Sequence, residues 1–205
     1  MSNTSDPQEL KKKQILDAAY KRFSHYGYSK TTMNEIAGDL SMSKALLYYY
    51  FPDKSQLYAG VIRKLSDEYL AALQHKLNQN CTINEAFYFV LQRIHRTISS
   101  HYNFFDYFRL HQQNIPDSIW NIIREIHQTE VNLLTELYRK QVSDTFAETH
   151  NLQEIIELIF NALDSVQNIF DKHKQPIFPD VEQYEIMYAQ KKLLLSILLN
   201  GLKTL

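Results

Sequence analysis

The stretch SMSKALLYYYFPDKSQL, residues 41–57, holds three consecutive tyrosines followed by Phe51 and Pro52. Ser43 can cap a helix in which Leu47 and Phe51, four residues apart, face inward. Pro52 has no amide N–H and disfavours helical backbone at the residue before it, so this helix should end near Phe51. Successive helical residues lie about 100° apart, so three tyrosines in a row cannot all face one core. At least one of them must face something else.

Helix signals surround this stretch. Asp6-Pro7 begins a helix that Gly27 can end, because glycine takes the left-handed conformation found at helix ends. Thr32 to Glu35 is a capping box for a short second helix, and Asp53 opens a long fourth helix to about Leu77. Only Leu40-Ser41-Met42 separates the second helix from the third. This pattern predicts a helix-turn-helix, with Ser41 where a glycine is often found.

The rest of the chain also predicts helices and no strands. Thr82 to Glu85 is a second capping box, and Gly201 is a stop at the far end. No segment alternates with a period of two residues over a useful length, and no repeat of 20–50 residues recurs. The expected fold class is all-α with about nine helices, the later ones near residues 82–100, 103–114, 116–142, 151–172 and 180–200.

Composition narrows the class of protein. The chain is 44% hydrophobic, enough for a core, and no N-terminal apolar run resembles a signal peptide. The longest apolar run, Leu193 to Leu199, is far shorter than the ~20 residues that a membrane span needs. Cys81 is the single cysteine and cannot form an internal disulfide, so a reducing, cytoplasmic location is expected. No membrane partner is expected.

Charge is unevenly distributed along the chain. Residues 1–64 hold 10 Lys/Arg and 6 Asp/Glu, whereas the remaining residues hold 12 and 17. The first 64 residues are thus mildly basic and the remainder is acidic, which indicates an anionic partner for the N-terminal part. A charge difference this small also fits an ordinary solvated surface.

Catalytic and metal-binding patterns are missing from the sequence. The eight histidines are scattered, and neither HExxH nor CxxC spacing occurs. There is no G-x-S-x-G motif and no phosphate-binding loop. We expect no enzyme activity, no metal site and no cofactor.

The tyrosines have two open interpretations. With Leu47 and Phe51 inward, Tyr48 and Tyr49 turn outward on the face of Lys44. A cation and two phenols on one helix face suit the major groove, where they can contact phosphates or base edges. Alternatively, the two tyrosines cover the edge of the core or join a protein interface.

A family resemblance favours the first interpretation. Residues 15–57 resemble the N-terminal domain of TetR-type transcriptional regulators. The shared residues are Ile15-Leu16, Ala18-Ala19, Phe23, Gly27-Tyr28, Thr31-Thr32-Met33, Ile36-Ala37, Ser43-Lys44, Leu47-Tyr48, Phe51, Lys54 and Leu57. The resemblance implies DNA contacts at Thr32, Asn34, Ser43, Lys44, Ala45, Leu46, Tyr48, Tyr49 and Lys54. Two departures occur: Leu40-Ser41 replaces the usual Ala-Gly of the turn, and Leu46 stands where a small polar residue is common.

The resemblance also implies two domains and two further sites. Residues 1–55 are expected to be the DNA-binding domain, and residues 56–205 a helical ligand-binding and dimerisation domain. An apolar cavity is implied there, and we expect its wall among Phe87, Phe104, Phe108, His111, Trp120 and Tyr138. The last two helices are implied to pair with those of a second copy, and the expected contacts are Ile155, Ile159, Leu163, Leu194, Leu195 and Leu198.

Together these expectations describe a homodimeric regulator. It is expected to be a repressor that a small apolar or aromatic molecule releases from a palindromic operator. The alternative is a helical ligand-binding or scaffolding protein whose helix-turn-helix no longer binds DNA. Lys44, Tyr48, Tyr49 and Lys54 argue against that alternative, because they keep the chemistry that faces phosphate.

Overall fold

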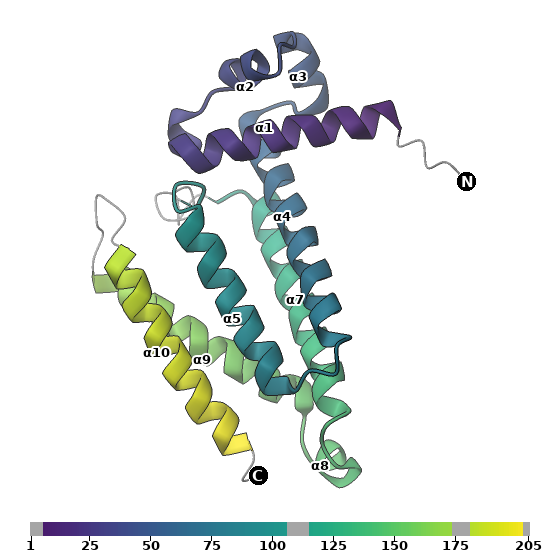
Figure 1. Ribbon diagram of the computed structural model, residues 1–205, viewed down its shortest axis with the longest axis vertical. Helices are drawn as coiled ribbons and strands as arrows, with labels where there is room; N and C mark the ends of the chain where they lie inside the picture. The colour runs from purple at the N-terminus through teal and green to yellow at the C-terminus, as the bar shows by residue number, and fades with distance from the viewer. Residues whose placement is uncertain (1–5, 106–114, 174–180, 203–205) are drawn as a thin grey trace. The chain divides into compact units, whose positions relative to one another are not determined.

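The structure is a computed structural model that describes residues 6–105, 115–173 and 181–202. These residues contain nine helices and no strand, which confirms the all-α prediction (Figure 1). The helices are α1 (Pro7–Lys30), α2 (Met33–Asp39), α3 (Lys44–Tyr50), α4 (Lys54–Leu77), α5 (Ile83–Ser100), α7 (Asp117–Arg139), α8 (Asp144–Thr149), α9 (Leu152–His173) and α10 (Val181–Gly201).

Helix boundaries differ from expectation in three places. Gly27 interrupts α1 with φ 80° and ψ 166°, but the chain resumes helical turns to Lys30 instead of stopping. α7 ends at Arg139, and the unpredicted helix α8 follows, capped by the Ser143 hydroxyl, which accepts a hydrogen bond from the Phe146 amide. The helix expected at 103–114 falls mostly outside the described residues, and its first part, to residue 105, is a turn.

The chain divides into two compact units by its contacts. Unit 1 comprises Met1–Glu68 and His101–Glu125, and unit 2 comprises Tyr69–Ser100 and Ile126–Leu205. The first part of α4, the turn at 101–105 and the first part of α7 therefore belong to the same unit as α1, α2 and α3. The functional division at residues 55 and 56 stays a prediction.

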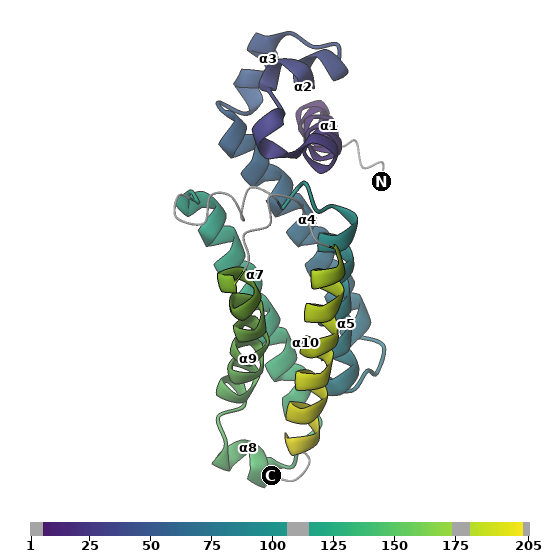
Figure 2. The same ribbon diagram turned by 90° about the vertical axis from the view of Figure 1, so that its left-hand side faces the viewer.

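Unit 1 is built around α1. α2 packs on α1 and on α3, and Figures 1 and 2 show α2 and α3 on the same side of α1. Ile15, Phe23, Ile36 and Leu47 are completely buried between these helices. The turn at 101–105 joins this core, because Phe104 is completely buried as well.

An aromatic cluster connects that turn to α1 and α4. The ring of Tyr58 stacks on Phe104 with 4.8 Å between centroids and meets the rings of Phe23 and Tyr28 edge-on at 5.3 and 5.1 Å. The Tyr58 hydroxyl donates to the carbonyl of Phe104. The Asn103 side chain donates to the carbonyl of His25 at 2.9 Å. Unit 1 thus depends on side chains about 45 to 80 residues apart in sequence.

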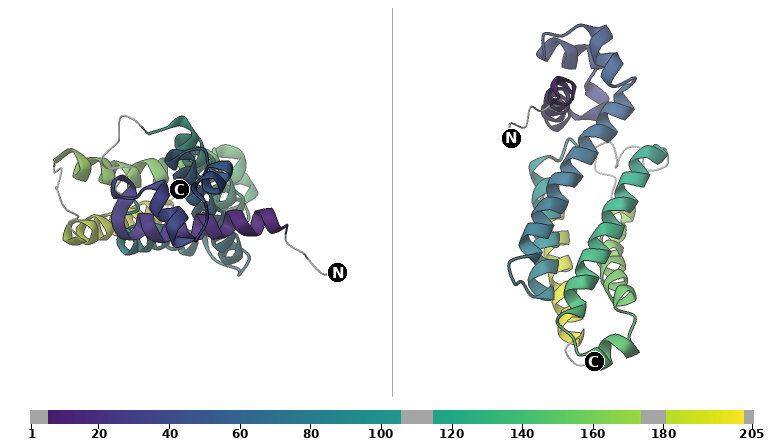
Figure 3. Two further views of the ribbon diagram at one scale, coloured as in Figure 1. Left: turned by 90° about the horizontal axis from the view of Figure 1, so that it is seen from above. Right: turned by 90° about the vertical axis from the view of Figure 1, so that its right-hand side faces the viewer.

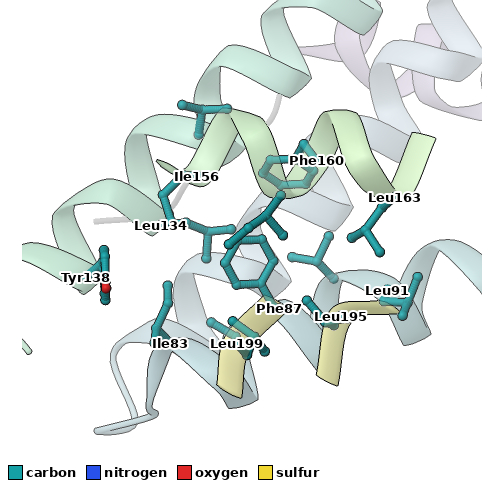
Figure 4. Packing of buried hydrophobic residues seen from close by; sticks show 14 of the residues in the cluster. Ile83, Phe87, Leu91, Leu134, Tyr138, Ile156, Phe160, Leu163, Leu195 and Leu199 are labelled. Carbon is teal, nitrogen blue, oxygen red and sulfur yellow. The ribbon is translucent and has the colours of Figure 1, made fainter. Parts of the chain in front are cut away.

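Unit 2 has a continuous apolar core. α10 packs against both α5 and α9, as Figure 1 and the further views in Figure 3 show. Phe87 of α5 lies at the centre of the cluster, with Leu134 of α7, Ile156 of α9 and Leu195 of α10 around it (Figure 4). No described helix is long and apolar enough to cross a membrane.

Candidate nucleic-acid interface

α3 presents the face that the sequence predicted. At its start, the Ser43 hydroxyl caps α3 by accepting a hydrogen bond from the Leu46 amide at 3.2 Å. At its end, the Phe51 amide donates to the Leu47 carbonyl at 2.9 Å. Leu47 is completely buried, which fixes the rotation of the helix. The outward residues are Lys44, Ala45, Leu46, Tyr48 and Tyr49, all exposed, with Tyr49 at 70%.

The exposed tyrosines are not needed by the core. Tyr50 is half-buried and meets the Tyr49 ring edge-on, with 5.4 Å between centroids. The ammonium of Lys44 lies 5.8 Å from the centre of the Tyr48 ring. This geometry groups a cation and two phenols on one solvent-facing side of α3, and it leaves their role in DNA binding a prediction.

The turn between α2 and α3 takes a conformation that glycine prefers. Ser41 has φ 50°, which lies in the left-handed region. It occupies the position at which the sequence pattern usually has a glycine. The Ser41 amide donates to the Gly38 carbonyl and the Met42 amide to the Ala37 carbonyl, both at 3.0 Å. These bonds close the turn despite the strain at Ser41.

The start of α2 is the predicted capping box. The Glu35 amide donates to the Thr32 hydroxyl at 3.3 Å, and the Thr32 amide donates to the Glu35 carboxylate at 2.8 Å. The hydroxyl of Thr32 also donates to that carboxylate, and these bonds lower the pKa of Glu35. Thr32 and Asn34 are both exposed at this end of α2.

Arg22 holds α2 against α1. Its guanidinium donates to both carboxylate oxygens of Asp39, at 2.6 and 2.9 Å, and lies 3.4 Å from Glu35. The hydrogen bonds from Arg22 lower the pKa of Asp39. This ion pair links the last residue of α2 to α1 and so orients the helix-turn-helix.

Lys54 has a structural partner that the sequence did not reveal. Its ammonium donates to the carbonyls of Tyr28 and Thr31 at 2.9 and 3.0 Å and lies 4.2 Å from the centre of the Tyr28 ring. Burial lowers the pKa of this ammonium. Two of its three N–H groups are therefore committed to the end of α1.

A shallow hollow opens beside these groups. It has a volume of about 300 Å³ and lies between the starts of α2, α3 and α4. Lys44 and Lys54 contribute cations, and Asp53 contributes a carboxylate that accepts a hydrogen bond from the Gln56 amide at 2.7 Å. The full lining is Thr31, Thr32, Met33, Asn34, Lys44, Tyr48, Asp53 and Lys54. The hollow thus brings together four of the predicted contact residues of α2 and α3, together with Lys54.

The predicted ligand-binding residues fall in both units. Phe104 and Trp120 belong to unit 1, where Phe104 is packed in the aromatic cluster and Trp120 is 41% exposed. Phe87 and Tyr138 belong to the core of unit 2 and are 1% and 5% exposed. Phe108 and His111 lie outside the described residues. Three of the four described candidates are therefore core residues of their own unit, and their role toward a ligand stays a prediction.

The predicted dimer contacts are mostly turned into unit 2. Ile159, Leu163 and Leu195 are 3%, 6% and 0% exposed, so they offer almost no surface to a partner. Ile155, Leu194 and Leu198 are half-buried at the edge of the same core. Among the described side chains of these two helices, the exposed large apolar ones are Leu158, Ile186, Leu193 and Ile197. Periodicity could not find them, because α10 carries six apolar residues among the seven from Leu193 to Leu199.

Comparisons with known proteins agree with this geometry. Residues 15–61 match the family model of bacterial regulatory proteins of the tetR family. The transcriptional regulator RutR of Escherichia coli is 45% identical over 64 residues, which are 31% of this chain and 30% of RutR. The match thus spans less than a third of that relative.

The whole fold also has solved counterparts. A transcriptional regulator from Cytophaga hutchinsonii is 28% identical, with a TM-score of 0.76 over 93% of this chain and 97% of that one. FadR from Bacillus subtilis, solved in complex with stearoyl-CoA, is 16% identical, with a TM-score of 0.62 over 92% and 98% of the two chains. These findings agree with the resemblance seen in the sequence: residues 15–61 match the tetR family of bacterial regulatory proteins, and the whole fold is similar to that of a solved transcriptional regulator.

Proposed function

We propose that this protein is a homodimeric, ligand-responsive regulator of transcription that binds operator DNA through α3. The exposed, capped face of α3 carries the proposal. Lys44, Tyr48 and Tyr49 project from a helix whose rotation is fixed by the completely buried Leu47. Such a face presents hydrogen-bond donors without needing to rearrange on binding.

The remaining contacts follow from the same surface. Thr32 and Asn34 flank the hollow at the start of α2, where a phosphate oxygen can accept hydrogen bonds from the Asn34 side-chain amide and the Lys44 ammonium. Leu46, 39% exposed, can touch a thymine methyl but cannot bond a phosphate. The surface therefore supports both backbone positioning and base reading.

Selection of bound duplexes from a random pool tests this role. The expected result is a palindrome with two half-sites, one for each protomer. Tyr49→Ala should change preference at one or two base positions, whereas Tyr88→Ala, which removes an exposed tyrosine of α5, should change none. If no duplex were enriched, the scaffolding alternative would replace this proposal.

Dimerisation is proposed to use the outer faces of α9 and α10. Leu158, Leu193 and Ile197 are about 60% exposed on two helices that pack against each other. Burying such side chains between two copies removes apolar surface from water. These three residues replace Ile159, Leu163 and Leu195 in the proposed interface. Sedimentation at micromolar concentration should give a dimer, and a monomer there would contradict the proposal.

The effector is proposed to be a small apolar or aromatic molecule that favours release of DNA. FadR of B. subtilis, which shares this fold, is solved with stearoyl-CoA. By thermodynamic linkage, saturating operator must weaken effector binding by the factor by which the effector weakens operator binding. Trp120 is the single tryptophan of the chain and 41% exposed, so its fluorescence offers a readout for an effector screen. Equal effector affinities with and without operator would refute the coupling.

A further inference from the structure

The apolar core of unit 2 borders a buried carboxylate. Glu130 of α7 is 5% exposed, and among the described residues it is the only Asp or Glu that is buried. The next residue, Val131, belongs to the core around Phe87. Charged side chains are almost never fully buried unless they are paired, because the charge loses its hydration. The partners of Glu130 therefore decide what this carboxylate can do.

The described partner of Glu130 is one hydroxyl group. Tyr69 of α4 donates to Oε1 of the carboxylate. Among the described residues, no hydrogen bond reaches Oε2, and no Lys, Arg or His forms an ion pair with Glu130. Within this part of the chain, one of the two carboxylate oxygens is thus left without a donor.

The ionised form of Glu130 also lacks a paired positive charge among these residues. Burial raises the pKa of the carboxyl group to about 7, and the negative charge of Asp164 on α9 acts in the same direction. The ionised and neutral forms are therefore nearly balanced at neutral pH. A cation that reached Oε2 would supply both the missing donor and the missing charge, and it would favour the ionised form.

Aromatic rings lie near this carboxylate. Tyr69, which holds Oε1, packs against the core of unit 2. His127 lies one helical turn before Glu130 on α7, and its ring meets the Phe160 ring of α9 edge-on, with 5.3 Å between centroids. Phe160 in turn lies 5.6 Å from Phe87 (Figure 4). Ring faces attract an ammonium group, and ring edges and faces also cover an alkyl chain.

We propose that Glu130 binds the ammonium group of an amine through Oε2, and that the apolar chain of this amine lies along Phe160. The inference rests on the proposed function and deepens it, because it names the chemical class of the effector. Tyr69 occupies Oε1, so Oε2 is the atom that accepts from the ammonium. The apolar part of the ligand is held by the core side chains, and the carboxylate selects an amine against a neutral molecule of the same shape.

The test compares amines with alcohols of the same chain length. The probes are n-hexylamine, n-octylamine and n-decylamine, each paired with the corresponding alcohol, and calorimetric titration of the full-length protein measures their affinities. The parent should bind the best amine about tenfold more tightly than its alcohol, as expected for one hydrogen bond to a charged group. Glu130→Gln should bind the two equally. The matched control is Glu136→Gln, which removes an exposed carboxylate of the same helix and should keep the preference.

The pH dependence of the amine affinity gives a second readout. The ammonium stays protonated at neutral pH, as that of lysine does. Affinity for the amine should therefore rise about tenfold per pH unit below pH 7, where Glu130 must first lose its proton, and level off above pH 7. The other titratable or charged groups around this site are Tyr69 of α4, Arg93 of α5, His127 of α7 and Asp164 of α9. His127→Gln should keep this dependence, whereas Glu130→Gln should abolish it.

The outcomes separate this inference from the proposed function. An amine preference that Glu130→Gln alone abolishes, together with release of the selected palindrome by the amine from the parent but not from Glu130→Gln, supports it. Equal affinity of the parent for amine and alcohol, or no binding of any probe at millimolar concentration, overturns it and leaves DNA binding standing. If the amine bound through Glu130 but no duplex were enriched by the protein, the regulatory function would fail and the amine site would remain.

Discussion

Glu35 and Asp39 of unit 1 and Glu130 of unit 2 show how the surroundings of a carboxylate decide what it contributes to stability. In unit 1, Glu35 and Asp39 are exposed, accept hydrogen bonds from close partners, and have lowered pKa values. In unit 2, Glu130 is 5% exposed and accepts a hydrogen bond from the Tyr69 hydroxyl, and burial raises its pKa to about 7. A charge that keeps its water and gains a partner stabilises a fold, whereas a charge that loses its water costs stability. Whether a carboxylate is exposed or buried, more than its residue type, therefore decides whether it stabilises or destabilises the fold.

The largest effect is expected from charging two neighbouring leucines of α10. Leu195→Glu should unfold unit 2, because a carboxylate at a completely buried site costs on the order of 5 kcal/mol. Leu193→Glu, at a site 64% exposed, should leave the protomer folded and dissociate the dimer. Thermal melts and sedimentation distinguish the two results. A folded Leu195→Glu monomer would mean that the two faces of α10 are assigned the wrong way round.

Lowering the pH should change the contributions of Glu130 and Glu35 to the stability of the fold in opposite directions. The folded state holds the Glu130 proton up to about pH 7, whereas the unfolded chain loses it near pH 4.5. The Glu130 contribution to stability is therefore full below pH 4.5 and lost as the pH rises through 7, a change of about 3 kcal/mol. The negative charge of Asp164 also raises the pKa of Glu130.

Glu130→Gln should remove this loss between pH 4.5 and 7 in denaturant titrations. Glu35 contributes in the reverse sense, because its pKa is lowered: its stabilisation is present above the unfolded pKa and lost as the pH falls through the folded value. Glu35→Gln should therefore flatten only the acidic side of the profile. Identical pH profiles for parent and Glu130→Gln would show that Glu130 is solvated.

Substitutions of Lys54 and Lys44 should distinguish a lysine that stabilises unit 1 from a lysine that binds DNA. Lys54→Met removes two hydrogen bonds from a charged donor and should cost about 2 kcal/mol of unfolding free energy. Lys44→Met, at an exposed site, should leave the melting temperature unchanged and reduce the salt slope of DNA binding by about 0.9 per protomer. Equal melting temperatures for the two variants would contradict the structural role of Lys54.

The smallest effect concerns the turn of the helix-turn-helix. Ser41→Gly should stabilise unit 1 by about 0.5 kcal/mol, because glycine takes φ 50° without the steric cost that a Cβ brings. Ser41→Val should destabilise it, since β-branched residues rarely adopt positive φ. Chemical denaturation of both variants against the parent measures the difference, and a Ser41→Gly variant less stable than the parent would refute the strain.

Sequence alone was informative where the determining contacts are local. The caps of α2 and α3, the turn at Ser41 and the outward rotation of Tyr48 and Tyr49 all follow from residues within four positions of one another. Their hydrogen bonds and helical rows need no distant partner. The all-α fold and the exposed face of α3 were therefore predictable.

The tertiary structure decided what depends on distant contacts. It assigned Lys54 to carbonyls of α1 more than twenty residues away, and it packed Phe104 on Tyr58 in unit 1. It also turned Leu195 inward and Leu193 outward on a helix that is apolar on nearly every side near its end. Local periodicity cannot choose between such faces, because the choice depends on which neighbouring helices remove more apolar surface from water.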